Sequence, residues 1–133
     1  MKSILTIVLF LSAVLSITQL NSQPRQPSSF KLNSFKDVPE DLQGCGDSYY
    51  LSESEKKAGR SICFTDYDVY FLKINGKSYR LTEKEASGKY SIDVKELTNK
   101  KEDVEYHVLT AILTIKLGSK VIWQKKVIGD GGC

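Results

Sequence analysis

The dipeptide Asn75-Gly76 constrains the fold of this chain more than any other feature, because β-prone residues stand on both sides of it. Asn and Gly both tolerate positive φ, so a two-residue loop of this kind favours a type I′ turn between antiparallel strands. Residues 69–74 and 77–82 therefore form a predicted hairpin. Its register follows from the turn and places apolar residues on one core-facing side. The predicted pairs are Ile74–Lys77, Leu72–Tyr79 and Tyr70–Leu81.

A second hairpin is predicted around Gly118-Ser119, since a glycine at the first position of a two-residue loop suits a type II′ turn. Residues 104–117 and 120–128 would form its strands. The predicted register pairs Leu117 with Lys120, Ile115 with Ile122 and Leu113 with Gln124. Trp123 would then point away from the side on which Ile115 lies.

Shorter β-prone segments complete the pattern. Further strands are predicted at residues 48–51, 60–65 and 89–97. Between them lie a charged turn or short helical turn at 52–59 and polar loops at 83–88 and 98–103, and a flexible glycine-rich arm is predicted at 129–133. The sequence therefore predicts an all-β fold, a small antiparallel β-barrel or sandwich of about six to seven strands.

An apolar run precedes the predicted domain. Residues 4–17 are almost wholly apolar, follow the basic Lys2 and lead into polar residues, which is the pattern of a secretory signal peptide. The run is shorter than the roughly 20 apolar residues of a membrane span. We expect residues 1–22 to be a cleaved signal peptide, 23–41 an extended Pro-containing leader, and 42–133 the β domain. The protein is predicted to be secreted or periplasmic, with no membrane insertion after signal cleavage.

Three cysteines, Cys45, Cys63 and Cys133, stand in a chain predicted to enter an oxidising compartment, where a disulfide is expected. They allow three different single bridges. Cys45 and Cys133 lie among glycines at the two ends of the domain, whereas Cys63 lies in an apolar strand and resembles a small buried hydrophobe. We therefore predict a Cys45–Cys133 disulfide and a reduced, buried Cys63.

Composition argues against several classes of function. The 133 residues contain 19 Lys and Arg against 16 Asp and Glu, and a net charge of +3 is too small to indicate a nucleic-acid partner. The single histidine, His107, leaves few zinc ligands and few acid–base groups. The sequence contains no phosphate-binding glycine motif, no Gly-x-Ser-x-Gly and no calcium loop. These observations predict a non-enzymatic β domain, without cofactor or metal, that binds an unidentified partner.

Aromatic residues are further candidates for binding. The chain has seven Tyr, five Phe and one Trp, and the tyrosines are spread over the predicted strands. Cross-strand packing, with the tyrosine hydroxyls at the rim, is the simpler interpretation. The alternative is an exposed aromatic platform for a sugar or a protein.

Several short segments resemble uncharacterised small secreted proteins that are found widely in Bacteroidota. The segments are residues 38–46 (VPEDLQGCG), 49–52 (YYLS), 66–68 (DYD) and 73–77 (KINGK). Those proteins also often end in a Gly- and Cys-rich tail such as residues 129–133. The resemblance covers most of the predicted domain, and it implies bacterial export without implying an activity.

Two segments resemble periplasmic C-type lysozyme inhibitors. Residues 74–81 (INGKSYRL) and 86–91 (ASGKYS) are similar to the hairpin and the Ser-Gly-x-x-Tyr loop of that family of small, disulfide-bonded β-barrels. In the family, the loop Ser and the Lys of a Trp-x-Lys-Gly motif enter the lysozyme cleft. The matching residues are Ser87 and Lys125, although the loop is one residue shorter here and Lys126 replaces the motif glycine. The resemblance implies an alternative function, inhibition of a C-type lysozyme through Ser87 and Lys125.

Overall fold

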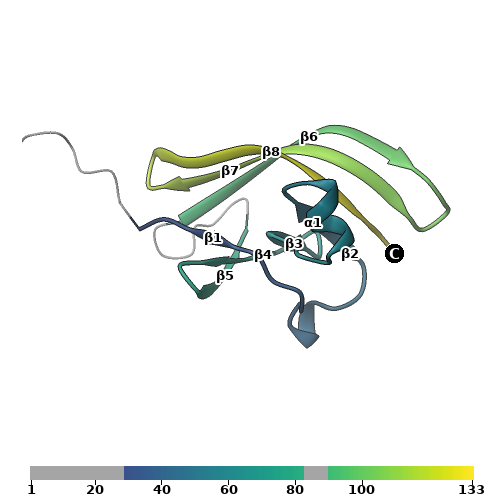
Figure 1. The fold of residues 1–133 in the computed structure, drawn as a ribbon, viewed down its shortest axis with the longest axis horizontal. Helices are drawn as coiled ribbons and strands as arrows, with labels where there is room; N and C mark the ends of the chain where they lie inside the picture. The colour runs from purple at the N-terminus through teal and green to yellow at the C-terminus, as the bar shows by residue number, and fades with distance from the viewer. Residues whose placement is uncertain (1–28, 83–89) are drawn as a thin grey trace, which may run out of the picture.

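The computed structural model describes residues 29–82 and 90–133. Within these residues the chain forms one antiparallel sheet of eight strands in the order β1-β4-β3-β2-β8-β7-β6, with β5 also paired to β4 (Figure 1). The strands are β1 (Leu32–Asn33), β2 (Gly46–Tyr50), β3 (Cys63–Thr65), β4 (Tyr70–Ile74), β5 (Lys77–Leu81), β6 (Tyr90–Lys101), β7 (His107–Leu117) and β8 (Lys120–Gly132). A 3-10 turn, η1 (Glu40–Leu42), and a short helix, α1 (Glu53–Lys57), complete the described elements. The predicted all-β, antiparallel fold is confirmed, with eight strands where about six to seven were predicted.

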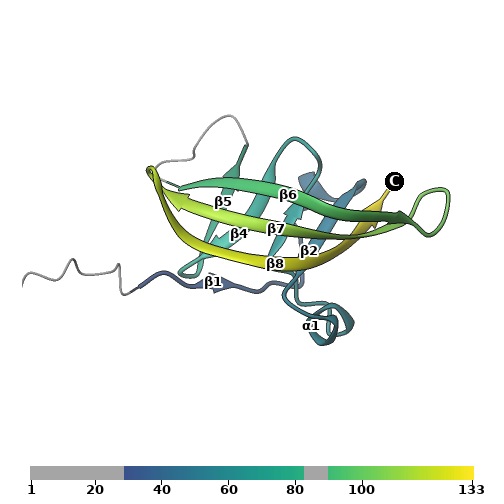
Figure 2. The same cartoon turned by 90° about the horizontal axis from the view of Figure 1, so that it is seen from above.

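The sheet is strongly bent but not closed. The long strands β6, β7 and β8 form one arched layer, and the shorter strands β1, β4 and β5 form a second layer (Figures 1 and 2). β2 connects the layers, because it pairs with β3 along one edge and with β8 along the other. Among the described residues no backbone pairing joins β5 to β6; these edges meet through the rings of Tyr79 and Tyr90, whose centroids are 5.1 Å apart. The described part is thus an open sheet folded over its own core.

The main core lies between these layers. Its buried side chains alternate along the strands that line it, as the two-residue period of a strand requires. They include Leu72 and Ile74 on β4, Leu81 on β5, and Leu109, Ala111, Leu113 and Ile115 on β7. Burying one Leu or Ile side chain contributes about 1.5–3 kcal/mol, so this interior is the main source of stability.

A smaller apolar cluster lies on the opposite face of β4. Its buried members are Phe35, Leu42, Phe64 and Phe71. The rings of Phe35 and Phe71 meet edge to face with centroids 5.0 Å apart. Phe30 and Leu32 pack instead against the main core, and β1 pairs with β4. Part of the segment predicted as a leader therefore contacts both apolar clusters.

The first predicted hairpin is confirmed in its turn and in its register. Asn75 and Gly76 have φ values of 53° and 77°, as a type I′ turn requires. The pairs are Ile74–Lys77, Leu72–Tyr79 and Tyr70–Leu81. The local sequence therefore determines this part of the sheet.

The second predicted hairpin is correct at its turn and wrong beyond it. Leu117 pairs with Lys120 as predicted. The structure then pairs Ile115 with Trp123 and Leu113 with Lys125, where the predicted partners were Ile122 and Gln124. The reason is a β-bulge in which Ile122 is the extra residue, so the register shifts by one. Trp123 consequently shares a side with Ile115 and packs against the core.

Two segments predicted to be irregular are strands. β6 continues through the predicted polar loop to Lys101, and β8 continues through the predicted flexible arm to Gly132. The end of β8 pairs with β2 on one side and with β7 on the other. Backbone hydrogen bonds on both sides order a segment that has few side chains to pack. The prediction of a flexible arm is therefore wrong.

The charged segment between β2 and β3 forms a short helix, which is one of the two alternatives that the sequence predicts. Ser52 caps α1, because its Oγ accepts a hydrogen bond from the N–H of Glu55 at 3.3 Å. The chain leaves the helix at Gly59, which has a φ of 70°. No helix in the described ranges is long and apolar enough to cross a membrane.

Candidate functional site

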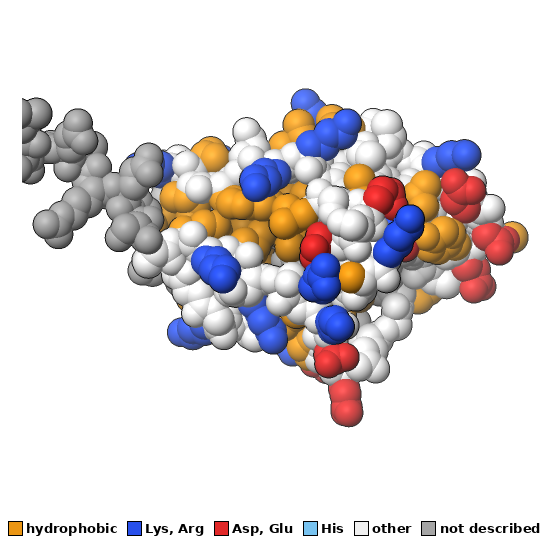
Figure 3. All heavy atoms as spheres, in the orientation of Figure 1, with side chains coloured by type: hydrophobic (Ala, Val, Ile, Leu, Met, Phe, Trp, Pro, Cys, Tyr) orange, Lys and Arg blue, Asp and Glu red, His pale blue; other side chains and the backbone are white. Residues whose placement is uncertain are grey.

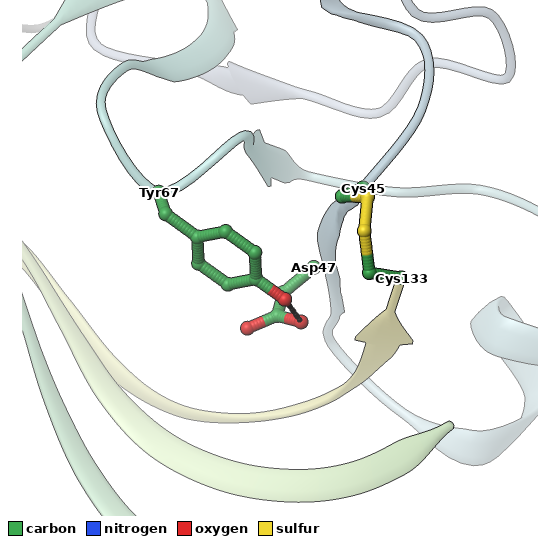
Figure 4. The surroundings of a disulfide bond; sticks show 4 residues. All are labelled: Cys45, Asp47, Tyr67 and Cys133. Carbon is green, nitrogen blue, oxygen red and sulfur yellow. Dashed lines mark hydrogen bonds between the residues drawn. A yellow bond between two sulfur atoms is a disulfide. The ribbon is translucent and has the colours of Figure 1, made fainter. Parts of the chain in front are cut away.

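The predicted Cys45–Cys133 disulfide is present and ties β2 to β8 at one end of the sheet (Figure 4). Cys45 precedes β2 and Cys133 follows β8. Because the two strands pair Gly46 with Gly132, the Cα atoms of the two cysteines lie 4.4 Å apart. The bond therefore fastens two neighbouring strands at the point where β2 begins and β8 ends.

Cys63 is a free thiol inside the core, as the sequence predicts. It has no exposed surface, and burial raises the pKa of its thiol. The thiolate is the nucleophilic form of cysteine, so a buried thiol held in its neutral form is inert. Cys63 therefore acts as a small apolar core residue.

A buried carboxylate lies beside the disulfide. Asp47 on β2 is 6% exposed, and its Oδ1 accepts a hydrogen bond from the hydroxyl of Tyr67 at 3.1 Å (Figure 4). The Nε2 atom of His107, at the start of β7, lies 2.8 Å from the same oxygen, although its N–H is not aligned for a hydrogen bond. Burial raises the pKa of Asp47, and the charge of His107 and the Tyr67 hydrogen bond partly offset that rise. We refer to Asp47, Tyr67 and His107 as the Asp47 cluster.

A glycine makes the contact between Asp47 and His107 possible. Gly131 on β8 is the cross-strand partner of Asp47 on one side and of His107 on the other. Opposed residues project from the same face of a sheet, so a side chain at Gly131 would stand between the carboxylate and the imidazole. A Cβ atom at Gly131 would overlap Oδ1 of Asp47 and the carbonyl oxygen of Gly46. The Asp47 cluster therefore spans three strands because the middle strand has no side chain there.

The backbone of Tyr67 adopts an unusual conformation. Its φ of 77° is in the left-handed region, which costs about 1–2 kcal/mol for a residue with a side chain. The loop offsets this cost through its own hydrogen bonds. The N–H of Tyr67 donates to Oγ1 of Thr65 at 3.0 Å, and Oδ1 of Asp66 accepts from two later N–H groups at 3.0 and 2.8 Å. Tyr67 is thereby held with its hydroxyl on Asp47 and its side chain 55% exposed, and strained residues of this kind occur at ligand-binding sites.

A surface cleft of about 300 Å³ lies beside the Asp47 cluster. Tyr67 and His107 line it together with the turn between β6 and β7, where Val104 is 81% exposed and Tyr106 is 40% exposed. Figure 3 shows apolar and acidic side chains gathered at this end of the molecule. We call this feature the disulfide-end cleft. Exposed apolar side chains around a hollow indicate an interaction surface.

The cleft offers groups that can bind and orient a partner. The carboxylate of Asp47 can orient His107, but the neighbouring Cys45 and Cys133 are bonded to each other and offer no thiol. Within residues 29–82 and 90–133, no three His, Cys, Asp or Glu side chains are grouped so that they could hold a metal ion. The cleft combines exposed aromatic surface with the buried contact between Asp47 and His107.

The two residues implied by the lysozyme-inhibitor resemblance have different outcomes. Ser87 lies outside the described residues. Lys125 lies on β8 opposite Leu113, and its Nζ is 5.9 Å from the centroid of the Trp123 ring. Lys125 is exposed and does not line the disulfide-end cleft.

Sequence reasoning considered His107 alone and missed its partners. Asp47 and Tyr67 come from β2 and from the loop after β3, so no local motif joins them to His107. The one signal in the sequence is Gly131, which reveals the cluster only when β8 is placed between β2 and β7. The sequence does not reveal that placement, because the glycines of residues 129–133 favour a flexible arm.

Replacing His107 by Gln is expected to make the stability fall more steeply as the pH rises. Burial raises the pKa of Asp47 above its ordinary value of 3.8. The carboxyl therefore stabilises the fold at pH values below 3.8, and this stabilisation is lost as the pH rises through the raised pKa. The charge of His107 opposes this shift, so its removal should raise the pKa further. We expect the urea midpoint of His107→Gln to fall more than that of the wild type as the pH rises above about 4.

The double variant Asp47→Asn/His107→Gln is the control for this experiment. It lacks the titrating carboxyl, so the extra slope of the single variant should disappear. Other acidic residues titrate equally in all three proteins and cancel in the comparison. A His107→Gln profile that is no steeper than the wild-type profile would contradict the proposed coupling between His107 and Asp47.

Comparison with protein families, with curated proteins and with solved structures finds no match to this chain. The candidate site therefore depends on its own geometry. That geometry consists of the disulfide, the Asp47 cluster and the cleft beside them.

Proposed function

We propose that this chain is a secreted or periplasmic, non-enzymatic domain that binds a partner through the disulfide-end cleft. The observation that carries the proposal is the exposure of Val104, Tyr106 and Tyr67 around one hollow. Single exposed apolar residues are normal on a protein surface, but a group of them around a cleft indicates a binding site. Tyrosine in particular is enriched at protein interfaces.

The surroundings of the cleft support a binding role because they are held in place. The disulfide fixes the ends of β2 and β8, and the Asp47 cluster links the Tyr67 loop to β7. A surface that is already ordered loses little conformational entropy when a partner binds. A site built on these contacts is therefore suited to specific recognition.

Export is supported by the predicted signal peptide at residues 1–22 and by the disulfide, which forms in oxidising compartments. The intact mass of the exported protein tests this part of the proposal. We expect a mass that lacks residues 1 to about 22. A mass that still includes these residues would refute the cleavage.

The binding role is tested by comparing two substitutions of exposed valines. Val104→Asp places a charge at the disulfide-end cleft, whereas Val121→Asp places the same charge on β8, where Val121 is 47% exposed and does not line the cleft. Each protein is immobilised at equal density and exposed to native envelope and culture-medium fractions. We expect Val104→Asp to lose a partner that the wild type and Val121→Asp both retain.

Thermal unfolding of the two variants serves as the folding control, because both positions are exposed and neither change should disturb the core. Equal retention of the partner by Val104→Asp and Val121→Asp would place the binding surface elsewhere. If the wild-type protein retains no partner, the proposed function is contradicted.

The lysozyme-inhibitor alternative makes a separate prediction, supported by the exposed position of Lys125 on β8. An inhibitor would slow a C-type lysozyme at micromolar excess, and Ser87→Ala with Lys125→Ala would relieve the inhibition. The lysine would pair with a catalytic carboxylate, and removal of one partner of a desolvated pair costs about 2–5 kcal/mol. Lysis of bacterial cell walls measured by turbidity decides the question, and unchanged lysozyme activity would exclude this alternative.

A further inference from the structure

We infer that the disulfide-end cleft binds a cationic side chain, lysine or arginine, presented by a partner protein. This inference rests on the proposed function and adds the chemical class of the group that is recognised. Two tyrosine rings and the carboxylates around them carry the argument.

Both tyrosines that line the cleft donate their hydroxyl groups to carboxylates. The hydroxyl of Tyr67 donates to Oδ1 of Asp47 at 3.1 Å, and the hydroxyl of Tyr106 donates to Oδ2 of Asp130 at 2.9 Å. The same oxygen of Asp130 also pairs with Lys56, whose Nζ lies 3.5 Å away. A phenol that donates to an anion gains electron density in its ring. The face of an aromatic ring attracts cations through its quadrupole, and added electron density strengthens that attraction. Both side chains also remain substantially exposed, so their rings are accessible to a partner.

Carboxylates at the rim favour the same class of ligand. Asp103 and Glu105 line the cleft, and neither forms an ion pair with a basic side chain in the described part of the chain. Among the described residues that line the cleft, Lys101 is the one lysine or arginine, and Lys56 pairs with the Asp130 carboxylate that Tyr106 contacts. A cation would meet two carboxylates and two exposed tyrosine rings there. An anionic group would be repelled by those carboxylates.

The setting of these groups indicates a side chain of a protein rather than a free ion. Val104 projects from the turn between β6 and β7 and is 81% exposed, so it offers an apolar contact next to the charged groups. A cationic side chain flanked by apolar residues would cover Val104 while its charge enters the cleft. Lysine and arginine carry apolar stems that suit such a surface.

Capped pentapeptides provide a direct test. The probes are Ac-Gly-Leu-Arg-Leu-Gly-NH₂ and its matched forms with citrulline, a neutral isostere, or glutamate in the central position. Each is titrated into uniformly ¹⁵N-labelled protein, and the backbone amide shifts of residues 104–107 and Gly132 are followed. We expect saturable shifts with the arginine peptide, and affinities at least about 5-fold weaker with citrulline and glutamate.

Paired substitutions separate the ring from the hydroxyl. Tyr106→Leu removes the ring and is expected to weaken binding of the arginine peptide about 3- to 10-fold, whereas Tyr106→Phe keeps the ring and should lose less. Glu105→Gln should also weaken binding. Asp93→Asn removes a carboxylate from an exposed position on β6 that does not line the cleft, and it should leave binding unchanged.

Several results would overturn the inference. They are equal binding of the arginine and citrulline peptides, wild-type affinity in Tyr106→Leu, or an absence of shifts with every peptide. Shifts of the same amides caused by an oligosaccharide such as chitotriose, with none caused by the arginine peptide, would also overturn it and would identify a sugar site. The proposed function is judged separately by the Val104→Asp capture experiment, so a cleft that binds a partner without preferring cations is recognised as such.

Discussion

Reducing the Cys45–Cys133 disulfide is expected to lower the free energy of unfolding by about 4–5 kcal/mol. The two cysteines are 88 positions apart in the sequence, so the bond closes a long loop and restricts the unfolded chain strongly. Domains of ordinary size are stable by only about 5–15 kcal/mol, so this loss would remove a large part of the stability. Urea unfolding with and without dithiothreitol, followed by the fluorescence of Trp123, measures the change.

Two variants control for other effects of reduction. Cys45→Ser/Cys133→Ser should match the reduced wild type and should not respond further to dithiothreitol. Cys63→Ala, in which the buried free thiol is removed, should keep the full response to reduction. Full reduction is established when three thiols per chain can be titrated. A urea midpoint that does not change in such fully reduced wild-type protein would contradict the predicted stabilisation.

Substituting Gly131 by Ala is expected to destabilise the fold by about 2–6 kcal/mol, because overpacking and a buried carboxylate left without a partner each cost about 1–3 kcal/mol. The new Cβ would overlap the carbonyl oxygen of Gly46 and Oδ1 of Asp47. The carbonyl oxygen cannot move without opening the pairing between β2 and β8. The carboxylate of Asp47 would have to turn away from His107 and remain buried without it. The urea midpoint at neutral pH measures the loss.

Gly118→Ala is the matched control for this substitution. Gly118 lies in the turn between β7 and β8, has a φ of 61°, and a Cβ there would meet nothing within 4 Å. The control should therefore lose only the conformational term of about 1–2 kcal/mol. Equal losses in Gly118→Ala and Gly131→Ala would show that steric overlap at the Asp47 cluster is not the cause.

The features that the sequence predicts correctly are those that neighbouring residues determine. The β4–β5 hairpin follows from Asn75-Gly76, whose preference for positive φ sets the turn and thereby the register. The turn between β7 and β8 follows in the same way from Gly118. The bulge at Ile122 does not, because a bulge adjusts the curvature of the whole sheet and its position depends on distant packing.

The candidate site could be predicted only in part, for a related reason. The pairing of Cys45 with Cys133 follows from their glycine-rich surroundings, and the burial of Cys63 from its apolar neighbours. Asp47 and Tyr67 become partners of His107 only through the pairing of β8 with both β2 and β7. Glycine has a low preference for strands, so the local sequence at Gly129 and Gly131 predicts a loop. The pairing with β2 and β7 nevertheless makes this segment a strand.

The ladder between β2 and β8 joins the two layers of the sheet through backbone hydrogen bonds. The two strands pair over five residue positions, and within the described ranges this ladder is the one backbone connection between the arched layer and the shorter strands. If this ladder opened locally, the amide hydrogens that bond between β2 and β8 would exchange with solvent before the other strand pairs separate. The disulfide links the two strands at one end of the ladder. It therefore opposes this local opening in the folded protein, in addition to restricting the unfolded chain.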